Sequence, residues 1–370
     1  MTVKKKVTVK NIDEIKDVEQ DVKKENKQAK LHSLVNELNK KFGTNAVYLG
    51  FPKDSEGNTP KVKRIKTGSV SLDAALGGGI PEGRYTEISG SLSSTKTSQA
   101  LHIIREAQQA GYVCALLDVE ATTDEEFVRS FGIDPTTLIY SRPASTEEAT
   151  QVMLNLQKSK IAHLGVLDSL AAMSPNKEQE SDMDETVRLG ITPNLLNEFF
   201  RKYQMNNNRL SREGAVPFTL ICINQLRESI GQYVEQERSP GGRGKGFTAT
   251  VDLRLRKSEW IAEGTGENKA VVGQVVSFKI DKNKLYRRMV TGSFDYYFAE
   301  NEAGVKPFYN DYIKDIVVCA IKSGIMQRTG AWFLYGGKKW QGLKSVIDEI
   351  RDDEELLNLM YNELMKKLTK

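Results

Sequence analysis

The chain has 370 residues, enough to bury a sizeable core and to form two or three domains. Its composition, 28% charged and 39% hydrophobic residues, is that of an ordinary soluble protein, and no apolar run approaches the roughly 18 residues of a membrane span. The basic N-terminus MTVKKKVTVK lacks the apolar segment of a secretory signal, so we expect a cytoplasmic protein. The formal net charge is only +4, so any binding of nucleic acid would depend on local patches of charge.

The three cysteines point to a reduced compartment. Cys114, Cys222 and Cys319 all lie in apolar segments, and they form neither a metal-type nor a disulfide framework. We therefore interpret them as small buried hydrophobic residues of a cytosolic protein.

The N-terminal part divides into a tail and an arm. Residues 1–24 are dominated by Lys, Glu, Asp and Val, which predicts a flexible charged tail. Within residues 25–66, an apolar stripe at helical spacing predicts a helix; it consists of Leu31, Leu34, Val35, Leu38 and Phe42. The short apolar stretch AVYLG follows, and the segment FPKDSEGNTPKVKR has the composition of a linker.

From about residue 67 to 300, short apolar runs alternate with helical segments. The expected elements are, in chain order, a strand at YTEIS, a helix over 95–110, a strand at VCALLDVE, a helix over 124–131, a strand at LIYS, a helix over 146–158, a strand at HLGVLDSL, a helix near 194–204 and a strand at FTLICINQ. This alternation predicts an α/β fold with a mostly parallel, twisted sheet that is covered by helices on both faces. The runs FTATVDLRLRK and VVGQVVSFKIDKN follow without a helix between them and predict added antiparallel strands at one side of the sheet.

Residues 301–370 predict a small separate α/β domain. A helix at YNDYIKDIVVCAIKSG precedes a strand pair at WFLYGGKKW with a Gly-Gly turn, and a charged helix ends the chain.

The stretch SGSLSSTKTSQA resembles a phosphate-binding loop except at one position. Gly90, Lys96 and Thr97 match the usual pattern, but Thr95 stands where the second glycine is expected. The stretch follows a predicted strand and opens a predicted helix, where helix N–H groups and dipole face an anion. Lysine could reach the β- and γ-phosphates and Thr97 could bind Mg²⁺. We place Thr95 in the first turn of the helix, in right-handed geometry that needs no glycine; an ordinary Ser/Gly-rich turn is the alternative.

Three further polar residues end predicted parallel strands, where open α/β sheets collect ligands. Glu120 could polarise an attacking water, Asp168 could hold Mg²⁺ through water, and Gln225 could sense a γ-phosphate. Each alone could be a polar strand end that faces solvent. Together with the loop they indicate an ATP site.

These segments resemble the RecA family of DNA recombinases. The resemblance runs from the helix at ENKQAKLHSLVNELNKKFG to the C-terminal domain, in TGSVSLDAALGGGIPEGRYTEISG, DVEATTDEEFVRSFGID, VLDSLAAMSP, INQLRESIG, SPGGRGKGF and KIDKNK. It implies a RecA-type P-loop ATPase core over residues 67–300, with an N-terminal helix-plus-strand polymerisation arm and a small C-terminal domain.

The resemblance implies roles for individual residues. Lys96 and Thr97 match the phosphate and magnesium residues, Glu120 the catalytic carboxylate, Asp168 the second acid near magnesium and Gln225 the γ-phosphate sensor. The implied nucleotide-binding residues are Gly90, Ser91, Ser93, Ser94, Thr95, Lys96, Thr97, Ser98, Asp124 and Phe127, of which Asp124 and Phe127 hold the adenine. Lys282 and Lys284 match lysines that reach the neighbouring subunit's ATP; a Lys-rich surface turn is the alternative.

Two long polar segments match the family's DNA-binding loops, at about 176–190 and 227–246. The residues implied to contact DNA are Leu189, Gly190, Arg201, Arg227, Ile230, Gly241, Gly242 and Arg243. Leu189 and Ile230 would wedge between bases, unless they are buried on an adjacent helix. The first loop is unusually acidic, so we expect few phosphate contacts there.

The resemblance implies a head-to-tail helical filament, in which the N-terminal helix and AVYLG dock on the next subunit. The helix could instead pack on its own core. The implied function is that of a DNA-dependent ATPase that uses ATP and Mg²⁺, forms filaments on single-stranded DNA and exchanges it with a homologous duplex in recombination and repair.

Several departures leave alternatives open. Thr95 replaces glycine, Leu92 stands where glutamate is usual, and the chain ends LMKKLTK without an acidic tail. These fit a divergent member, and a bacteriophage origin is one interpretation. One alternative is a DNA-binding, filament-forming paralogue with weak or no ATP hydrolysis; another is a ring-forming helicase motor, which the N-terminal arm and glycine-rich second loop disfavour.

Overall fold

The computed structural model describes residues 27–53, 56–179, 191–228, 237–238, 242–266 and 269–368. The contacts divide the chain into two units: residues up to Lys61 with Arg209–Ala215, and Val62–Asn208 with Val216–Lys370. The predicted tail at 1–24 lies outside the described residues.

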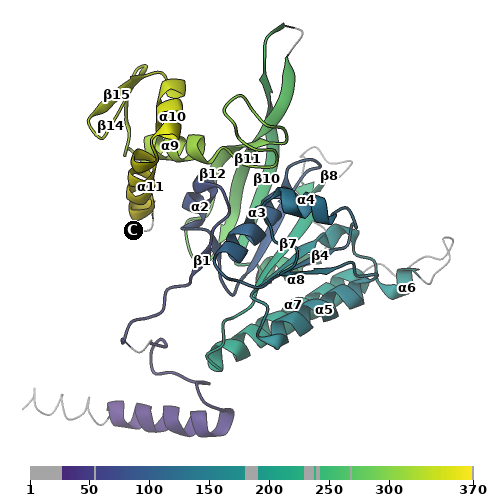
Figure 1. Cartoon of the computed structure of the whole chain (residues 1–370). Coiled ribbons are helices and arrows are strands. Elements are labelled where there is room, and N and C mark those ends of the chain that lie inside the picture. Colours follow the sequence, from purple (N-terminus) through teal and green to yellow (C-terminus); the bar gives the residue numbers. More distant parts are fainter. Residues whose placement is uncertain are drawn as a thin grey trace, which may run out of the picture. The chain divides into compact units, whose positions relative to one another are not determined.

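The larger unit is built on an eight-stranded sheet in the order β12-β11-β10-β3-β7-β6-β4-β5 (Figure 1). The strands are β3 (Tyr85–Gly90), β4 (Cys114–Asp118), β5 (Leu138–Ser141), β6 (Leu164–Asp168), β7 (Thr219–Gln225), β10 (Val251–Glu263), β11 (Ala270–Asn283) and β12 (Val290–Tyr297). Neighbouring strands from β10 to β5 are parallel, which confirms the predicted mostly parallel sheet.

The two added strands lie at one side of the sheet and pair antiparallel with each other, as predicted. β11 pairs antiparallel with β10 and with β12, but β10 runs parallel to β3. Phe247 and Thr248, which were predicted to begin β10, belong instead to helix α8 (Gly242–Thr248). Residues 226–250 form a long connection containing this helix, and such a crossover is what joins parallel strands.

Helices cover both faces of the sheet (Figure 1). They are α3 (Lys96–Gln109), α4 (Glu125–Ser130), α5 (Thr146–Ser159) and α7 (Ile191–Arg212), with α2 (Val70–Leu76) beside β12. Alternate strand residues face opposite ways: Ile221 and Ile223 pack in the core with α3, whereas Leu220 and Cys222 pack in the core with α5 and α7. Cys114, Cys222 and Cys319 are all buried, as expected.

Short elements complete the larger unit. They are β1 (Arg64–Ile65), β2 (Ile80–Pro81), a 3₁₀ turn at Leu170–Ala172, α6 (Asn176–Gln179), β8 (Arg227–Glu228) and β9 (Glu237–Arg238). β1 pairs with β2, and β8 with β9.

The C-terminal residues contribute a separate hydrophobic cluster. It is formed by α9 (Tyr312–Lys322), α10 (Leu343–Asp352), α11 (Glu354–Leu368) and the three-stranded sheet of β13 (Gln327–Thr329), β14 (Trp332–Tyr335) and β15 (Lys338–Gln341). Val70 of α2 joins this cluster, and Ser69 donates a 2.8 Å hydrogen bond to Asp315. Where one terminal helix was predicted, the structure has two, α10 and α11.

The smaller unit contains a helix over residues 27–42. Its apolar stripe is largely uncovered, with Leu31, Leu34 and Phe42 exposed. Residues 46–50 form no strand among the described residues. The Asn39 side chain instead bonds both the N–H and the carbonyl of Val47, at 2.9 Å each. A strand here would need its backbone groups free for a pairing partner.

Among the residues that the structure describes, none of the helices combines the length and the apolar character that crossing a membrane requires.

Candidate nucleotide site

The phosphate-type loop joins the end of β3 to the start of α3, as predicted. Gly90 closes β3, where an added Cβ would lie 2.3 Å from the Leu255 carbonyl oxygen and 2.4 Å from Ser94 Oγ. Only glycine fits at this position, because the Leu255 carbonyl of β10 and the Ser94 side chain of the loop both occupy the space of a Cβ.

Thr95 adopts a left-handed conformation, which contradicts the right-handed geometry expected from the sequence. It is the N-cap of α3 with φ 61° and ψ 25°, and Ser93 is also left-handed at φ 57°. A β-branched residue is disfavoured there, because its Cβ crowds the following carbonyl. The sequence could not reveal this, because the loop could begin its helix at either residue 95 or 96. The usual glycine at this position therefore has a conformational reason, and Thr95 is strained.

Hydrogen bonds within the loop occupy its carbonyl groups. Lys96 Nζ donates to the Ser91 oxygen at 2.7 Å, and Ser94 Oγ donates to the same oxygen at 2.8 Å. Thr95 Oγ1 donates to the Ser94 oxygen at 2.7 Å and so does not cap α3. The first turn of α3 contains no acidic residue. A helix N-terminus without its own cap is suited to bind an anion such as phosphate.

Thr97 and Asp168 lie together below this loop. Thr97 Oγ1 donates to Asp168 Oδ2 at 2.6 Å, and Asp168 is only 4% exposed. The pKa of Asp168 is raised to about 6, chiefly by burial; Glu120 and Asp118 also raise it, whereas Thr97 and Lys96 lower it. A hydroxyl and a carboxylate in an acidic, buried setting are hard oxygen donors that fit Mg²⁺.

Glu120 and Gln225 meet beside Asp168, although 105 residues separate them in the chain. Gln225 Nε2 donates to Glu120 Oε1 at 3.0 Å, and Ser169 Oγ donates to the same oxygen at 2.5 Å. The register explains the proximity, because Gln225 pairs with Gly90 and Asp118 pairs with Asp168. The structure therefore brings together the loop, Glu120, Asp168 and Gln225, which the sequence had grouped because each ends a predicted parallel strand. Ser169 was not predicted as a site residue, although it directly follows Asp168.

Asp124 and Phe127 have local roles in the structure. Asp124 caps α4, accepting from the Phe127 N–H at 2.7 Å, and it lines a cavity of about 300 Å³ with Tyr140 and Arg142. The Phe127 ring packs edge-on against Phe131 and Phe308. Their contact with adenine stays a prediction.

Lys282 and Lys284 do not lie near the chain's own phosphate loop. Lys282 pairs with Asp252, which pairs with Glu87 inside β3, three residues before Gly90. Both lysines bond the last carbonyls of α8: Lys282 Nζ to Gly246 at 2.5 Å and Lys284 Nζ to Phe247 at 2.9 Å. Burial and the neighbouring Lys284 lower the pKa of Lys282.

A buried ion pair near these lysines was not predicted. Lys245 Nζ lies 2.5 Å from Glu87 Oε1, which also accepts from Asn224 at 3.0 Å, and both charged side chains are almost fully buried. The sequence signal was an acidic residue inside the apolar strand YTEIS. The pair joins β3 to α8, the helix that begins within the second predicted DNA loop.

The predicted DNA-binding residues are only partly described. Leu189, Gly190, Ile230 and Gly241 lie outside the described residues. Arg201 is exposed on α7, and Arg227 lies in β8. Two of the predicted loop boundaries need correction: Asn176–Gln179 is helical, and Gly242 and Arg243 begin α8 rather than ending a loop. Residues 242–248 gain helical hydrogen bonds, with the Ala249 N–H bonded to the Lys245 carbonyl.

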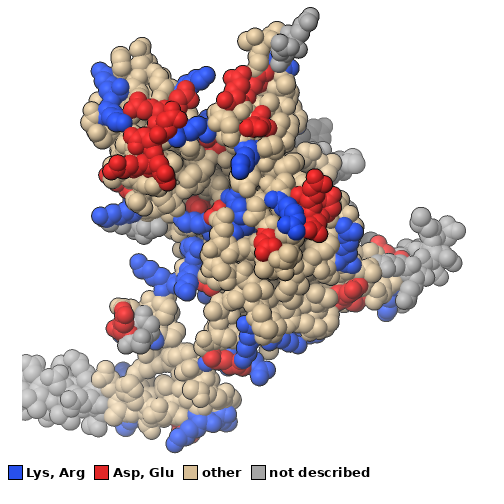
Figure 2. All heavy atoms as spheres, viewed as in Figure 1, with Lys and Arg blue, Asp and Glu red and all other residues tan. Residues whose placement is uncertain are grey.

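Two surface features do not involve the predicted site residues: the mixed surface charge and a second cavity. On the face that Figure 2 shows, basic and acidic side chains are interspersed, in line with the small net charge.

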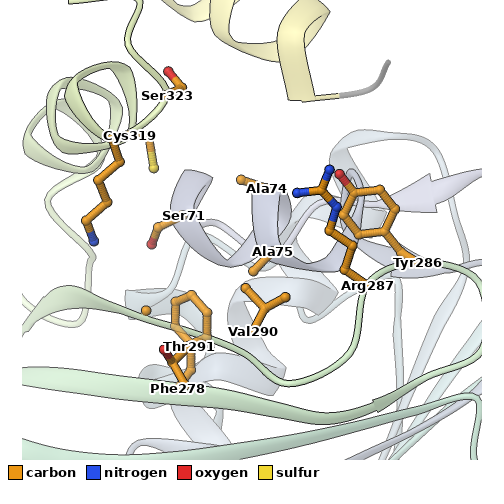
Figure 3. Close-up of a pocket in the computed structure, with 12 residues that line it drawn as sticks. Ser71, Ala74, Ala75, Phe278, Tyr286, Arg287, Val290, Thr291, Cys319 and Ser323 are labelled. Carbon is orange, nitrogen blue, oxygen red and sulfur yellow. The ribbon is translucent and has the colours of Figure 1, made fainter.

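A cavity of about 240 Å³ lies between α2, the β11–β12 strands and α9. Figure 3 shows Tyr286 and Arg287 on one side of it and Cys319 and Ser323 on another. It contains none of the predicted site residues.

Comparisons with known proteins agree with this geometry. The family model described as RecA N-terminal domain matches residues 29–303. Protein RecA of Chloroherpeton thalassium is 36% identical over 353 residues, which cover 95% of this chain and 92% of that protein. Protein RecA of Chlorobaculum tepidum is 35% identical over 92% of each chain, and that of Rubrobacter xylanophilus is 34% identical over 92% of this chain and 94% of its own. The chain therefore belongs to the RecA family and has its type of α/β core.

Proposed function

We propose that this chain is a DNA-dependent ATPase that forms helical filaments on single-stranded DNA and exchanges the bound strand with a homologous duplex. The observation that carries the proposal is the 3.0 Å contact between Glu120 and Gln225. It joins the proposed catalytic carboxylate to the residue at which the second DNA loop begins. A change in that loop on DNA binding would therefore move a group that touches Glu120.

ATP would bind with its phosphates at the N-terminus of α3. Lys96 exchanges the Ser91 carbonyl for the β- and γ-phosphates, which are stronger acceptors because they are charged. Thr97 and Asp168 would hold Mg²⁺, which supplies charge neutralisation at the phosphates. Asp124 and Phe127 would hold the adenine.

Glu120 would orient the attacking water, held in place by Ser169 and Gln225. Phosphoryl transfer depends mainly on positioning and electrostatic stabilisation. Lys282 and Lys284 would stabilise the charge from the neighbouring subunit. Their place at the far end of β11 supports this, because the chain's own loop is out of their reach.

Exposed apolar surfaces support a filament. β5 forms the edge of the sheet, and its Ile139 and Tyr140 are exposed. An edge strand offers unpaired backbone groups to an incoming strand, and residues 46–50 of a second copy are the proposed occupant, after Asn39 releases the backbone of Val47. The exposed stripe of the helix at 27–42 would dock with it. A head-to-tail contact of this kind does not close, so it builds a helix.

The deciding experiment is ATP turnover with and without single-stranded DNA, together with negative-stain images in a non-hydrolysable ATP analogue. We expect strong stimulation by DNA, and filaments rather than closed rings. Turnover absent in both conditions would support the non-hydrolysing paralogue, and rings would support a helicase motor.

The Glu120→Gln variant tests the catalytic assignment. We expect turnover to fall at least about 100-fold while nucleotide binding is kept, because the amide cannot accept a proton. Glu126→Gln is the matched control, since Glu126 is an exposed carboxylate on α4. Full activity in Glu120→Gln would refute the role.

A further inference from the structure

Two side chains from the antiparallel strands reach the phosphate loop. Gln274 Nε2 of β11 donates to the Ser93 carbonyl at 3.1 Å, and Tyr296 OH of β12 donates to Ser98 Oγ at 2.9 Å. Gln274 and Tyr296 are direct cross-strand partners and therefore lie on the same face of the sheet. They are 4% and 5% exposed.

These contacts bracket the strained part of the loop. Ser93 and Thr95 are both left-handed, and such residues persist only where surrounding structure holds them. The bonds at the Ser91 and Ser94 carbonyls come from within the loop itself and cannot anchor it to the sheet. Gln274 lies 181 residues away in the chain, and Tyr296 lies 198 residues from Ser98, so both tie this segment to a rigid element.

The position of the pair follows from the packing of β11. Gly273 is next to Gln274, and a Cβ there would lie 2.6 Å from the Tyr296 carbonyl oxygen. The two strands therefore approach closely where the pair is formed. Tyr296 also packs in the core that contains α3, so its hydroxyl has little freedom to move.

We propose that Gln274 and Tyr296 are positioning residues that hold the phosphate loop in its nucleotide-binding conformation against the strain at Thr95. The proposal rests on the proposed nucleotide binding. Neither side chain acts on the reacting atoms. Their loss leaves the loop free to relax toward right-handed geometry, which disperses the N–H groups that would bind phosphate.

The first test is calorimetric binding of Mg²⁺–ADP to the full chain. Gln274→Met keeps the side-chain volume and removes the donor, and we expect the Kd to rise about tenfold. Tyr296→Phe removes only a hydroxyl, and we expect a rise of about threefold. In steady-state hydrolysis the KM for ATP should rise by a similar factor with kcat within twofold, a split that general destabilisation does not produce.

Ser277→Ala is the matched control. Ser277 lies on β11, three residues beyond Gln274, and donates to the Arg256 carbonyl at 3.2 Å rather than to the loop. We expect no change in Kd. Thermal melting of every variant identifies any that fails to fold, in which case Tyr296→Phe carries the test.

A double-mutant cycle tests the link to Thr95. Glycine at position 95 accepts the left-handed conformation without strain, so Gln274→Met should weaken ADP binding less than threefold in the Thr95→Gly background. An equal loss in both backgrounds, or a Gln274→Met protein that binds ADP within twofold of wild type, would overturn the proposal.

Hydrogen exchange of the amides at 91–98, without nucleotide, separates this proposal from the proposed function. We expect faster exchange in Gln274→Met than in Ser277→Ala. If this difference is found but the wild-type protein binds no nucleotide, the proposed function alone is refuted. Identical exchange in the two variants would refute the positioning role of Gln274.

Discussion

Helices α3 and α5 have the same length, 14 residues, and both follow a strand of the parallel sheet, yet their N-termini differ in every respect. In α5 the N-cap is Ser145 in an extended conformation, and its hydroxyl accepts from the Glu148 N–H at 3.2 Å. The Glu148 carboxylate accepts in turn from the Ala144 N–H at 2.7 Å. Two acidic residues, Glu147 and Glu148, complement the helix dipole.

The N-terminus of α3 has none of these features. Thr95 is left-handed and makes no capping bond, the first turn lacks an acid, and the first residue is Lys96. A cation at this end opposes the helix dipole. The difference shows that α5 has a side-chain cap of its own, whereas α3 has none and is contacted from outside by Gln274 and Tyr296.

The largest effect that this comparison predicts is at Lys96. Lys96→Ala should lower ATP turnover at least about 100-fold, because the ammonium of this first residue of α3 would neutralise charge on the phosphates. Thermal stability should not fall, since the substitution removes a charge that opposes the dipole. Lys158→Ala, in the last turn of α5, is the control and should leave turnover unchanged. Normal hydrolysis by Lys96→Ala would refute the site.

Ser145→Ala should have the opposite effects to Lys96→Ala: lower stability and unchanged handling of ATP. Loss of the cap should destabilise the protein by about 1 kcal/mol in urea unfolding, while the KM for ATP stays the same. A changed KM would mean that the two helix starts are not separated in function as the comparison requires.

The smallest effect is expected for Thr95→Gly. Relief of the left-handed conformation favours the variant by about 1–2 kcal/mol, and the greater freedom of unfolded glycine offsets about half of that. The net gain should be below about 1 kcal/mol, and ADP should bind a few times more tightly when measured by calorimetry. Lower stability in Thr95→Gly would show that the threonine is not strained.

The sequence by itself determined the order of strands and helices in the core and the residues at the carboxyl ends of β3, β4, β6 and β7. Hydrophobic periodicity encodes these elements locally, and parallel strands bring their ends to one edge of the sheet. That is why Glu120, Asp168 and Gln225 could be grouped before the fold was known. The sequence also shows the acidic residue Glu87 inside β3. It does not identify Lys245 as the partner of Glu87, since 158 residues separate them.

Only the tertiary structure decided the conformation of the phosphate loop. A pattern of residue types does not define φ at Thr95, because the local preference of a threonine is for the opposite sign and contacts from distant strands override it. The same holds for the parallel course of β10, which depends on the crossover through α8, and for Lys282 and Lys284, whose distance from the loop follows from strand register. Local pattern specifies which groups the site contains, and long-range packing specifies how they are held.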